Sequence, residues 1–542
     1  MPTSLVLLNG RIHTLEGDRP PAAALACRGD RIFYVGDSDG VRGFIGAGTQ
    51  VIDLQGATAV PGLTDAHLHL LSLGFTQTQI NLADCADRTA MFEAIRQFAI
   101  AHPNDAWLLG RGWDQTRWTP PDFPTAADLD AVTGERPAWL MRLDGHTGWA
   151  NTAALRAARI TAATADPSGG KIARDAGGAP TGVLVDTAME LLRQHIPPPT
   201  AAQRRAALAA GQDLCLRVGL TCVHDAWSDL TTLGDFRAAE QAGELRLRVY
   251  AMVAGPGEDM QMVTQEPPQV GDGMLTIRCV KLFTDGALGS RGAALSEPYS
   301  DDPGNTGLFL NDEETLRAAI DLCLARGYQV ATHAIGDRAN RRLLDLYERA
   351  LTAHPHLHPR LRAEHAQIVA PADIPRFGQL GVLCSIQPIH QTDDMRWAEA
   401  RLGPERIAGA YAWRSLQAAG ALLVGGSDAP VASVSPAHGI HAAVTRQDAH
   451  GDPPGGWRPQ ERLTARAALD AYTIGGAYAA FEEEQRGTLA VGKRADVTVF
   501  DLDPLGVEPS ALRELKVRWT VVGGEVRYGG TTGPRQRRSH QS

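Results

Sequence analysis

The sequence predicts an α/β protein built on a (β/α)8 barrel, and two observations lead to this fold class. The middle of the 542-residue chain alternates short apolar runs with helical stretches rich in Ala, Leu and Arg, a pattern typical of βα units and a parallel sheet. The candidate strands number eight, which is the number that closes such a barrel. They lie near 59–66, 219–224, 246–253, 277–283, 328–333, 361–365, 382–387 and 421–427. The helical stretches include 89–101, 186–195, 203–217, 312–326, 338–353 and 463–482.

The two ends of the chain have a different character. Residues 1–58 and 487–530 contain β-rich runs separated by turn signals such as Asn-Gly and Gly-Asp. We therefore expect one small β-sandwich, assembled from both termini around a barrel at 59–486, although two unrelated terminal hairpins would give the same pattern. The polar and basic tail at 531–542 is expected to be disordered.

A long segment interrupts the rhythm of strands and helices. About 150 residues separate the first two candidate strands, which is too long for one βα connection. We expect an inserted subdomain at about 103–185, a stretch that holds five of the ten tryptophans. Because the insert follows a barrel strand, it is expected at the active-site end, as a lid or a wall for substrate.

Composition narrows the class of partner and the compartment. The net charge is −10 and no basic stripe is present, which argues against binding nucleic acid or an anionic membrane. No run approaches the ~18 uninterrupted apolar residues of a membrane span, and the N-terminus reads as a strand rather than a signal peptide. The seven cysteines are scattered, with no CxxC pair, as expected for buried thiols in a reducing compartment. We expect a cytoplasmic protein with a small-molecule substrate, and a homodimer stays open.

The stretch AVPGLTDAHLHL, residues 59–70, carries two histidines at the end of the first candidate strand. His67 and His69 are two residues apart, so an extended backbone places both imidazoles on one side of the chain. Such a pair can bind one metal ion. An ordinary pair of polar loop histidines is the alternative, and other strands must supply further ligands if the metal interpretation holds.

Other candidate strands do carry metal-competent side chains near their carboxyl ends. In a (β/α)8 barrel this end is the catalytic face. One histidine at a strand end is more often structural, but five strands that do this in order, counting the first, favour a site. Beyond His67 and His69, the residues are Lys281 on the fourth strand, His333 on the fifth, His365 on the sixth and Asp428 at the end of the eighth.

Lys281 is unusual because it lies within an apolar run, where a charged amine is costly to bury. The chain has only four lysines and uses arginine for most of its basic residues, which weakens the alternative of an ordinary surface lysine. A neutral lysine amine can react with CO2 to give a carbamate, an anionic oxygen ligand that can bridge two metal ions. Arginine cannot do this.

Together these motifs resemble the amidohydrolase superfamily: PGLTDAHLH, the strand lysine, THAIGD, AEHAQ and GSDAP occur in that order. The runs KLFTDGALGSRGAALSEPYSDDPGNTG, GWDQTRW and DGHTGWANTAAL are similar to amidohydrolase family 3, the YtcJ-like branch that includes N-substituted formamide deformylases. The resemblance covers nearly the whole chain and all ligand positions. It implies a distorted (β/α)8 barrel and metal-dependent hydrolysis, usually of a C–N bond.

The resemblance also implies a ligand set for a binuclear centre. One ion is bound by His67, His69 and Asp428, a second by His333 and His365, and carbamylated Lys281 bridges the two. Mixed nitrogen and oxygen ligation suits Zn²⁺, while Mn²⁺, Fe²⁺ or Ni²⁺, and a single ion, stay open. Asp428 would take a proton from the attacking water and pass it to the leaving amine, and Asp65 would support a ligand histidine.

Candidate substrate contacts lie in family-like motifs expected at the mouth of the barrel. They are Trp113, His146 and Arg291. Structural roles are the alternative: Trp113 in the core of the insert, and Arg291 in a salt bridge with Glu297. His224 and Asp225, after the second strand, are expected to point toward the site and to support it.

Three classes of function stay open at this point. The first is a metal-dependent amidohydrolase whose substrate is a formamide, an acyl amide, a carbamate, a cyclic amide or an ester. The second is an enzyme of the same fold with non-hydrolytic chemistry, such as isomerisation or decarboxylation. The third is a non-catalytic scaffold, but scaffolds in such families typically lose metal ligands, and all of the expected ligands are present.

Overall fold

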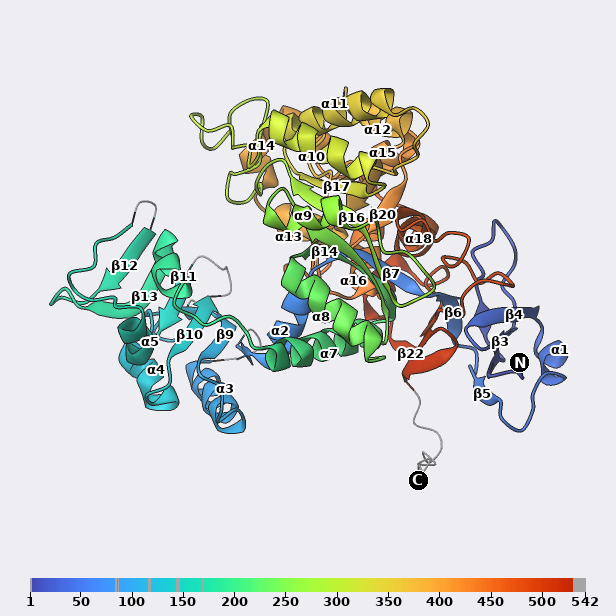
Figure 1. Cartoon of the computed structure of the whole chain (residues 1–542), viewed down its shortest axis with the longest axis horizontal. Coiled ribbons are helices and arrows are strands. Elements are labelled where there is room, and N and C mark those ends of the chain that lie inside the picture. The colour runs from blue at the N-terminus through green and yellow to red at the C-terminus, as the bar shows by residue number, and fades with distance from the viewer. Residues whose placement is uncertain are drawn as a thin grey trace. The chain divides into compact units, whose positions relative to one another are not determined.

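The computed structural model describes residues 2–82, 85, 87–115, 118–142, 147–167 and 170–529. The chain folds into two compact units (Figure 1). Met1–Leu70 and Gln212–Ser542 form the first unit, which holds the barrel and strands from both ends of the chain. Leu71–Gly211 form the second, which is continuous in the sequence.

Eight parallel strands form one sheet in the first unit, in the order β20-β19-β18-β17-β16-β15-β14-β7. The strands are β7 (Leu63–Leu68), β14 (Leu220–Ser228), β15 (Arg248–Ala254), β16 (Leu275–Phe283), β17 (Gln329–Ala334), β18 (Arg362–His365), β19 (Leu383–Ile386) and β20 (Leu423–Gly425). These eight strands confirm the predicted barrel. Most are buried along their whole length, because a barrel strand faces packed side chains inside and helices outside.

The barrel closes between its two end strands, β7 and β20, through backbone hydrogen bonds from β7 to the segment after β20. Asp428 N donates to His67 O at 2.6 Å, and His69 N donates to Ala429 O at 2.8 Å. Asp65 Oδ1 adds a side-chain link, since it accepts from the backbone of both His67 and Ser427 at 3.1 Å. The first and eighth strands are therefore held side by side at their carboxyl ends.

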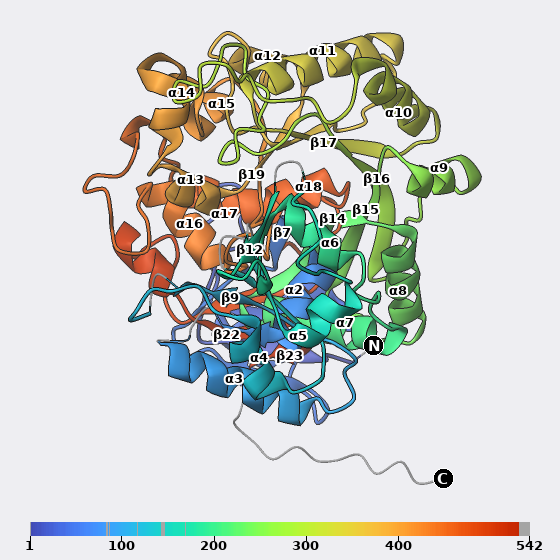
Figure 2. The same ribbon diagram turned by 90° about the vertical axis from the view of Figure 1, so that its left-hand side faces the viewer.

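Helices surround these strands, and Figure 2 shows α8, α10, α11 and α12 along the outside of the sheet. The helices that follow β14 and β16 each begin at an aspartate, Asp229 and Asp312, whose side chain accepts from a backbone amide of the first turn. The bounds are α7 (Ala201–Arg217), α8 (Leu230–Gln241), α9 (Gln261–Gln265), α10 (Glu313–Ala325), α11 (Asp337–Ala353), α12 (Ile374–Leu380), α13 (Pro388–Asp394), α14 (Ala398–Arg406), α15 (Trp413–Ala418), α16 (Pro436–Thr445), α17 (Ala465–Asp470) and α18 (Gly476–Ala479).

A sandwich of two sheets is assembled from both ends of the chain, as predicted. One sheet has the order β4-β3-β1-β5 and the other β2-β6-β21-β22-β23. Their apolar faces share one core, to which Leu7 and Leu25 contribute from the N-terminal part and Val497 and Val521 from the C-terminal part. The elements are β1 (Leu5–Leu8), β2 (Arg11–Ile12), β3 (Ala24–Arg28), β4 (Arg31–Gly36), α1 (Ser38–Arg42), β5 (Gln50–Asp53), β6 (Thr58–Pro61), β21 (Val497–Phe500), β22 (Val517–Val522) and β23 (Glu525–Tyr528).

The run expected as one strand at 59–66 is two strands, and Gly62 lies between them. β6 pairs with β21 in the sandwich, whereas β7 pairs with β14 in the barrel. A Cβ atom at Gly62 would lie 2.3 Å from Thr221 Oγ1 and 2.9 Å from Asp496 Cβ. Only glycine fits this close crossing from the sandwich into the barrel, so one apolar run serves two sheets.

The second unit contains a mixed six-stranded sheet in the order β12-β13-β11-β10-β9-β8. It extends beyond the insert expected at about 103–185, because Ile80, Met91 and Ile95 pack into one of its two cores and Leu192 into the other. Its elements are α2 (Leu70–Thr78), β8 (Ile80–Asn81), α3 (Arg88–Ala101), β9 (Leu108–Trp113), α4 (Ala126–Thr133), β10 (Ala138–Arg142), β11 (Thr147–Ala150), α5 (Thr152–Ala157), β12 (Gly170–Arg174), β13 (Pro180–Asp186) and α6 (Glu190–Arg193).

Neither unit holds a helix suited to a bilayer: among the described residues, every helix is too short or too polar to cross one. The tail expected to be disordered, 531–542, lies outside the described residues.

Candidate active site

Six residues predicted from the strand ends gather at the carboxyl end of the barrel. Asp428 Oδ1 lies 3.1 Å from His69 Nε2 and 3.6 Å from His67 Nε2. Lys281 Nζ lies 3.5 Å from His67 Nε2. The His365 ring centroid lies 4.8 Å from that of His67 and 4.5 Å from that of His333. Side chains from β7, β16, β17, β18 and the end of β20 therefore meet in one cluster.

Two of the imidazoles are fixed through their Nδ1 atoms. His67 Nδ1 lies 2.5 Å from Glu364 Oε2, and His365 Nδ1 lies 2.8 Å from Gln387 Oε1. Carboxylate and amide oxygens accept hydrogen bonds, so both Nδ1 atoms carry the proton and both Nε2 atoms keep a lone pair. A neutral imidazole with one nitrogen anchored in this way is the usual form of a metal ligand.

Burial keeps these histidines neutral. It lowers the pKa of His67 to about 4, with a further contribution from the Lys281 charge. Burial and Lys281 likewise lower the pKa of His333 to about 3. The pKa of His365 also lies well below its ordinary value, again because of burial first and the neighbouring His333 second. Near neutral pH these rings are therefore available as electron-pair donors.

Asp428 is held as a carboxylate among the histidines. Burial alone would raise its pKa, but the neighbouring His67 and the hydrogen bond with His69 outweigh burial and hold the pKa well below its usual range. Its φ of 59° and the φ of 76° at His365 are left-handed, which is rare for residues other than glycine. Strained backbone of this kind is concentrated at functional sites, where the surrounding structure enforces it.

Lys281 is 1% exposed and lies over the Phe283 ring at 4.9 Å. Burial lowers the pKa of its amine below the ordinary value, although Glu364 and Asp428 oppose this shift. The lysine expected on an interior strand position is thus buried beside the histidine cluster rather than on the surface.

The three residues expected to support the site are buried. Asp65 accepts from the backbone amide of the ligand candidate His67. Asp225 accepts from Leu70 N at 2.7 Å and from Ser228 Oγ at 2.6 Å, so it fixes the loop after β7. His224 Nδ1 accepts from Arg362 Nη1 at 3.0 Å.

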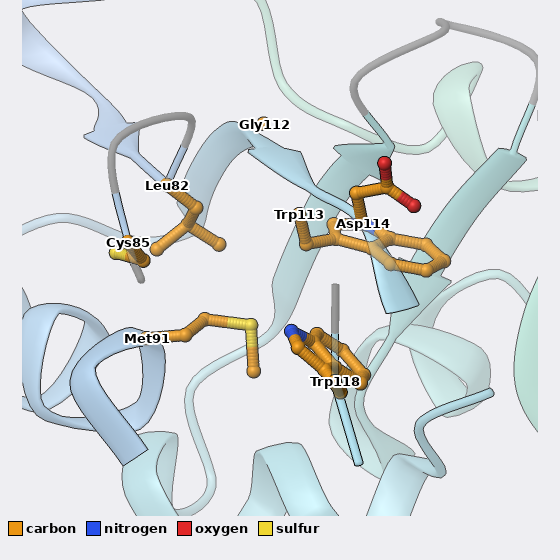
Figure 3. A pocket seen from close by; sticks show the side chains of 7 residues that line it. All are labelled: Leu82, Cys85, Met91, Gly112, Trp113, Asp114 and Trp118. Carbon is orange, nitrogen blue, oxygen red and sulfur yellow. The ribbon is translucent and has the colours of Figure 1, made fainter. Parts of the chain in front are cut away.

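Two of the three expected substrate contacts, Trp113 and Arg291, make structural contacts in the described part of the chain. Trp113 is 1% exposed in the core of the second unit, where its Nε1 donates to Leu140 O at 2.8 Å. With Met91 and Trp118 it lines a cavity there that has room for one water molecule at most (Figure 3). An aromatic-rich insert therefore builds its own core with these rings. Trp113 is corrected from a substrate contact to a core residue.

Arg291 is engaged in an ion pair, and its role as a substrate contact stays a prediction. Its guanidinium makes two hydrogen bonds of 3.1 Å to Asp301, which also pairs with Arg401. The alternative of a salt bridge was right in kind, but its partner is Asp301 rather than Glu297. The third expected contact, His146, lies outside the described residues.

Four residues of the site were not recognised in the sequence: Glu364, Gln387, His390 and Asp285. The first two hold ligand rings, as described above. His390, on α13, stacks on His365 with a ring separation of 6.1 Å, and its Nε2 lies 3.9 Å from Asp428 Oδ2. Asp285 Oδ1 lies 3.6 Å from His333 Nε2 and accepts from Ile335 N. Three polar residues in the four-residue strand RAEH were the available signal for Glu364.

The donor set fits a divalent metal ion. One ligand atom each from His67, His365 and Asp428 lies within 4.8 Å of the others, and all three residues are buried. Neutral imidazole nitrogens combined with carboxylate oxygen suit Zn²⁺ and neighbouring transition metals. Two further imidazoles adjoin this group, since His69 contacts Asp428 and the His333 ring lies against that of His365.

Comparison with known proteins adds the family. The sequence profile of the amidohydrolase family matches residues 50–528. The YtcJ protein of Bacillus subtilis (strain 168) is 36% identical over 89% of this chain and 90% of its own length. The LONG AFTER FAR-RED 3 protein of Arabidopsis thaliana is 35% identical over 97% and 91%. The N-substituted formamide deformylase of Arthrobacter pascens is 29% identical over 97% and 98%.

A solved structure shows the same architecture. It belongs to an uncharacterized metal-dependent hydrolase from Pyrococcus furiosus, which is 28% identical to this chain, with a TM-score of 0.77. The match covers 92% of this chain and 99% of that protein.

Replacing both His67 and His69 by alanine is expected to remove bound metal, because the double variant loses two of the nitrogens around Asp428. Metal content measured by mass spectrometry of the purified protein tests this. The matched control replaces His354 and His356, which are also two residues apart but lie outside the barrel cluster. Equal metal content in the His67/His69 variant and the wild type would contradict the assignment.

Proposed function

Because this chain belongs to the amidohydrolase family, we propose that it is a metal-dependent hydrolase that cleaves a C–N bond of a small non-peptide amide. The observation that carries the proposal is the buried cluster in which a carboxylate, Asp428, lies within 3.1–3.6 Å of two imidazoles at the carboxyl end of the barrel. The N-substituted formamide deformylase relative directs attention to N-formyl amines as the first substrates to test.

In this proposal the six predicted residues would hold a binuclear Zn²⁺ centre. His67, His69 and Asp428 would hold one ion, His333 and His365 would hold the second, and Lys281, as a carbamate, would be the ligand shared by both. Support comes from the contacts between these side chains and from the neutral state of His67, His333 and His365. When bound, the metal supplies Lewis acidity, which makes water a better nucleophile and the scissile carbonyl a better electrophile.

The chain's own groups move the protons. Asp428 takes a proton from the attacking water and delivers it to the leaving nitrogen, so one carboxylate serves as base and then as acid. His390 Nε2 has no hydrogen-bond partner among the described residues and lies 3.9 Å from Asp428 Oδ2. We assign this nitrogen to the substrate, as a hydrogen-bond donor beside the proton-transferring carboxylate.

Lys281 gains its carbamate from CO2. The lone pair of the neutral amine nitrogen forms a bond to the carbon of CO2, one C–O π pair moves to oxygen, and water takes the proton that the nitrogen releases. This converts a basic side chain into an anionic oxygen ligand. Burial supports this assignment, since it favours the neutral amine that reacts. Its place between the β7 histidines and those of β17 and β18 also supports a bridging position.

The proposed reaction is tested on a panel of formamides, acyl amides, carbamates and esters with the purified protein. We expect amine release from at least one amide, its loss after treatment with a chelator, and its return when Zn²⁺ is added. Quantifying both amine and acid separates hydrolysis from rearrangement. Turnover to an isomer without amine release, or activity indifferent to the chelator, would contradict the proposal.

Asp428→Asn is expected to lower kcat by ~10²-fold or more, the usual size of an acid–base contribution, because the amide cannot accept the proton of the attacking water. Since Asp428 is also a proposed ligand, metal content is measured on the same sample and kcat is expressed per bound metal. Near-wild-type turnover in the metal-loaded variant would rule out the proton-transfer role.

Lys281→Ala is expected to lose activity and most of the second ion, because the bridging anion is gone. Added short-chain carboxylic acids should restore part of both by filling the space. Lys516→Ala, at an exposed lysine, is the control. The carbamate itself is checked by the peptide mass of the active enzyme, without acid treatment, and an unmodified lysine at 281 in that enzyme would refute it.

A further inference from the structure

A buried ion pair lies directly beneath His67. Arg362 and Glu364 are two residues apart on β18 and have no exposed surface, with Arg362 Nε 2.8 Å from Glu364 Oε1. Removing two charges from water is expensive, and apolar replacements of buried ion pairs are often neutral or stabilising. Stability alone is therefore a weak reason for this pair, and its contacts point to another role.

Glu364 determines which nitrogen of His67 faces the metal cluster. Its Oε2 lies 2.5 Å from His67 Nδ1, and a carboxylate can only accept, so the proton of the ring is held on Nδ1. The lone pair is then on Nε2, the atom that lies 3.5 Å from Lys281 Nζ and 3.6 Å from Asp428 Oδ1. The contact fixes both the tautomer and the rotation of the ring.

Arg362 holds Glu364 and the backbone next to His67 at the same time. Its Nη2 donates to Ala66 O at 2.7 Å and to Ser385 Oγ at 3.3 Å, and its Nη1 donates to His224 Nδ1 at 3.0 Å. One guanidinium therefore joins β7, β14, β18 and β19. Ala66 directly precedes His67 in the chain. The ion pair therefore positions the main chain beside this histidine through Arg362, and its ring through Glu364.

The other anchored histidine is held differently. His365 rests on the neutral amide of Gln387, and His69 is 28% exposed at its side chain and contacts Asp428. Among the described ligand candidates, His67 differs in that its ring contacts a buried carboxylate at 2.5 Å. Loss of the ion pair is therefore expected to weaken binding of the ion that His67 shares with His69 and Asp428.

We propose that Arg362 and Glu364 are positioning residues that preset His67 for metal binding. The inference rests on the ligand role of His67 in the proposed function. Outer partners of metal-bound histidines typically contribute about 10–100-fold to metal affinity. The pair accordingly supplies affinity and geometry to one ion without touching substrate.

The test measures Zn²⁺ dissociation constants of the full-length apoprotein by competition with a chromophoric chelator. We expect Glu364→Ala to weaken binding of the ion assigned to His67, His69 and Asp428 by about 10–100-fold. Glu364→Gln, which has the shape of the native side chain and can still accept from Nδ1, should recover part of this loss. Each variant is also characterised by its melting temperature, so that a fall in affinity can be compared with a fall in stability.

The matched control is a second buried Arg–carboxylate pair remote from the cluster. Arg248 and Asp496 join the barrel to the sandwich, with Nε–Oδ2 and Nη2–Oδ1 distances of 2.8 and 3.1 Å. Asp496→Asn should lower the melting temperature while leaving the Zn²⁺ dissociation constant unchanged. It separates general loss of stability from loss of positioning.

Three outcomes overturn the inference. Wild-type affinity in both Glu364 variants would remove the positioning role while leaving the metal centre intact. Equal weakening by Asp496→Asn would show that the effect follows stability. Absence of metal binding by the wild-type protein would instead refute the proposed metal centre, and the inference with it. If Glu364→Ala does not fold, Glu364→Gln decides the question through its intermediate affinity.

Discussion

The closure of the barrel is the constraint on which the site depends. Two backbone hydrogen bonds, Asp428 N to His67 O and His69 N to Ala429 O, join the first strand to the segment after the eighth. These residues are far apart in the chain, yet the same two bonds set the carboxylate beside both imidazoles. Asp65 reinforces the junction, since one oxygen accepts from both sides of it. Closing the fold and assembling one half of the cluster are therefore a single event.

The strands and the ligand candidates could be predicted because barrel geometry produces a simple pattern in the sequence. Strands covered on both faces read as apolar runs, and a polar residue at the carboxyl end of such a run stands out against them. Lys281, His333 and His365 were recognised in this way. The boundary at Gly62 was missed because an apolar run continues through it, and only the close approach of Thr221 and Asp496 shows why the chain changes sheets there.

Contacts across the barrel could not be predicted, because they depend on which strands face one another. The AEH motif shows that Glu364 directly precedes His365 on a strand. Its contact with His67 could not be foreseen, because it joins two strands that are not neighbours in the sheet. Trp113 shows the opposite error. From sequence alone, an aromatic residue in a family-like motif is equally consistent with a substrate-binding wall and with a protein core. In the second unit such rings, Trp113 included, form the core. Local pattern identifies residue types, whereas pairing requires the fold.

Electrostatics relates the proposed carbamate to the number of ions. The charged side chains that act most strongly on Lys281 are the carboxylates of Glu364 and Asp428 and the guanidinium of Arg362, so these four groups are balanced in charge when the amine is protonated. A divalent ion adds two positive charges in surroundings that screen them poorly. Changing Lys281 from an ammonium to a carbamate shifts its charge from +1 to −1, which offsets one such ion. On the proposed chemistry, carbamylation and binding of the second ion therefore favour each other, and an ammonium at this position opposes both.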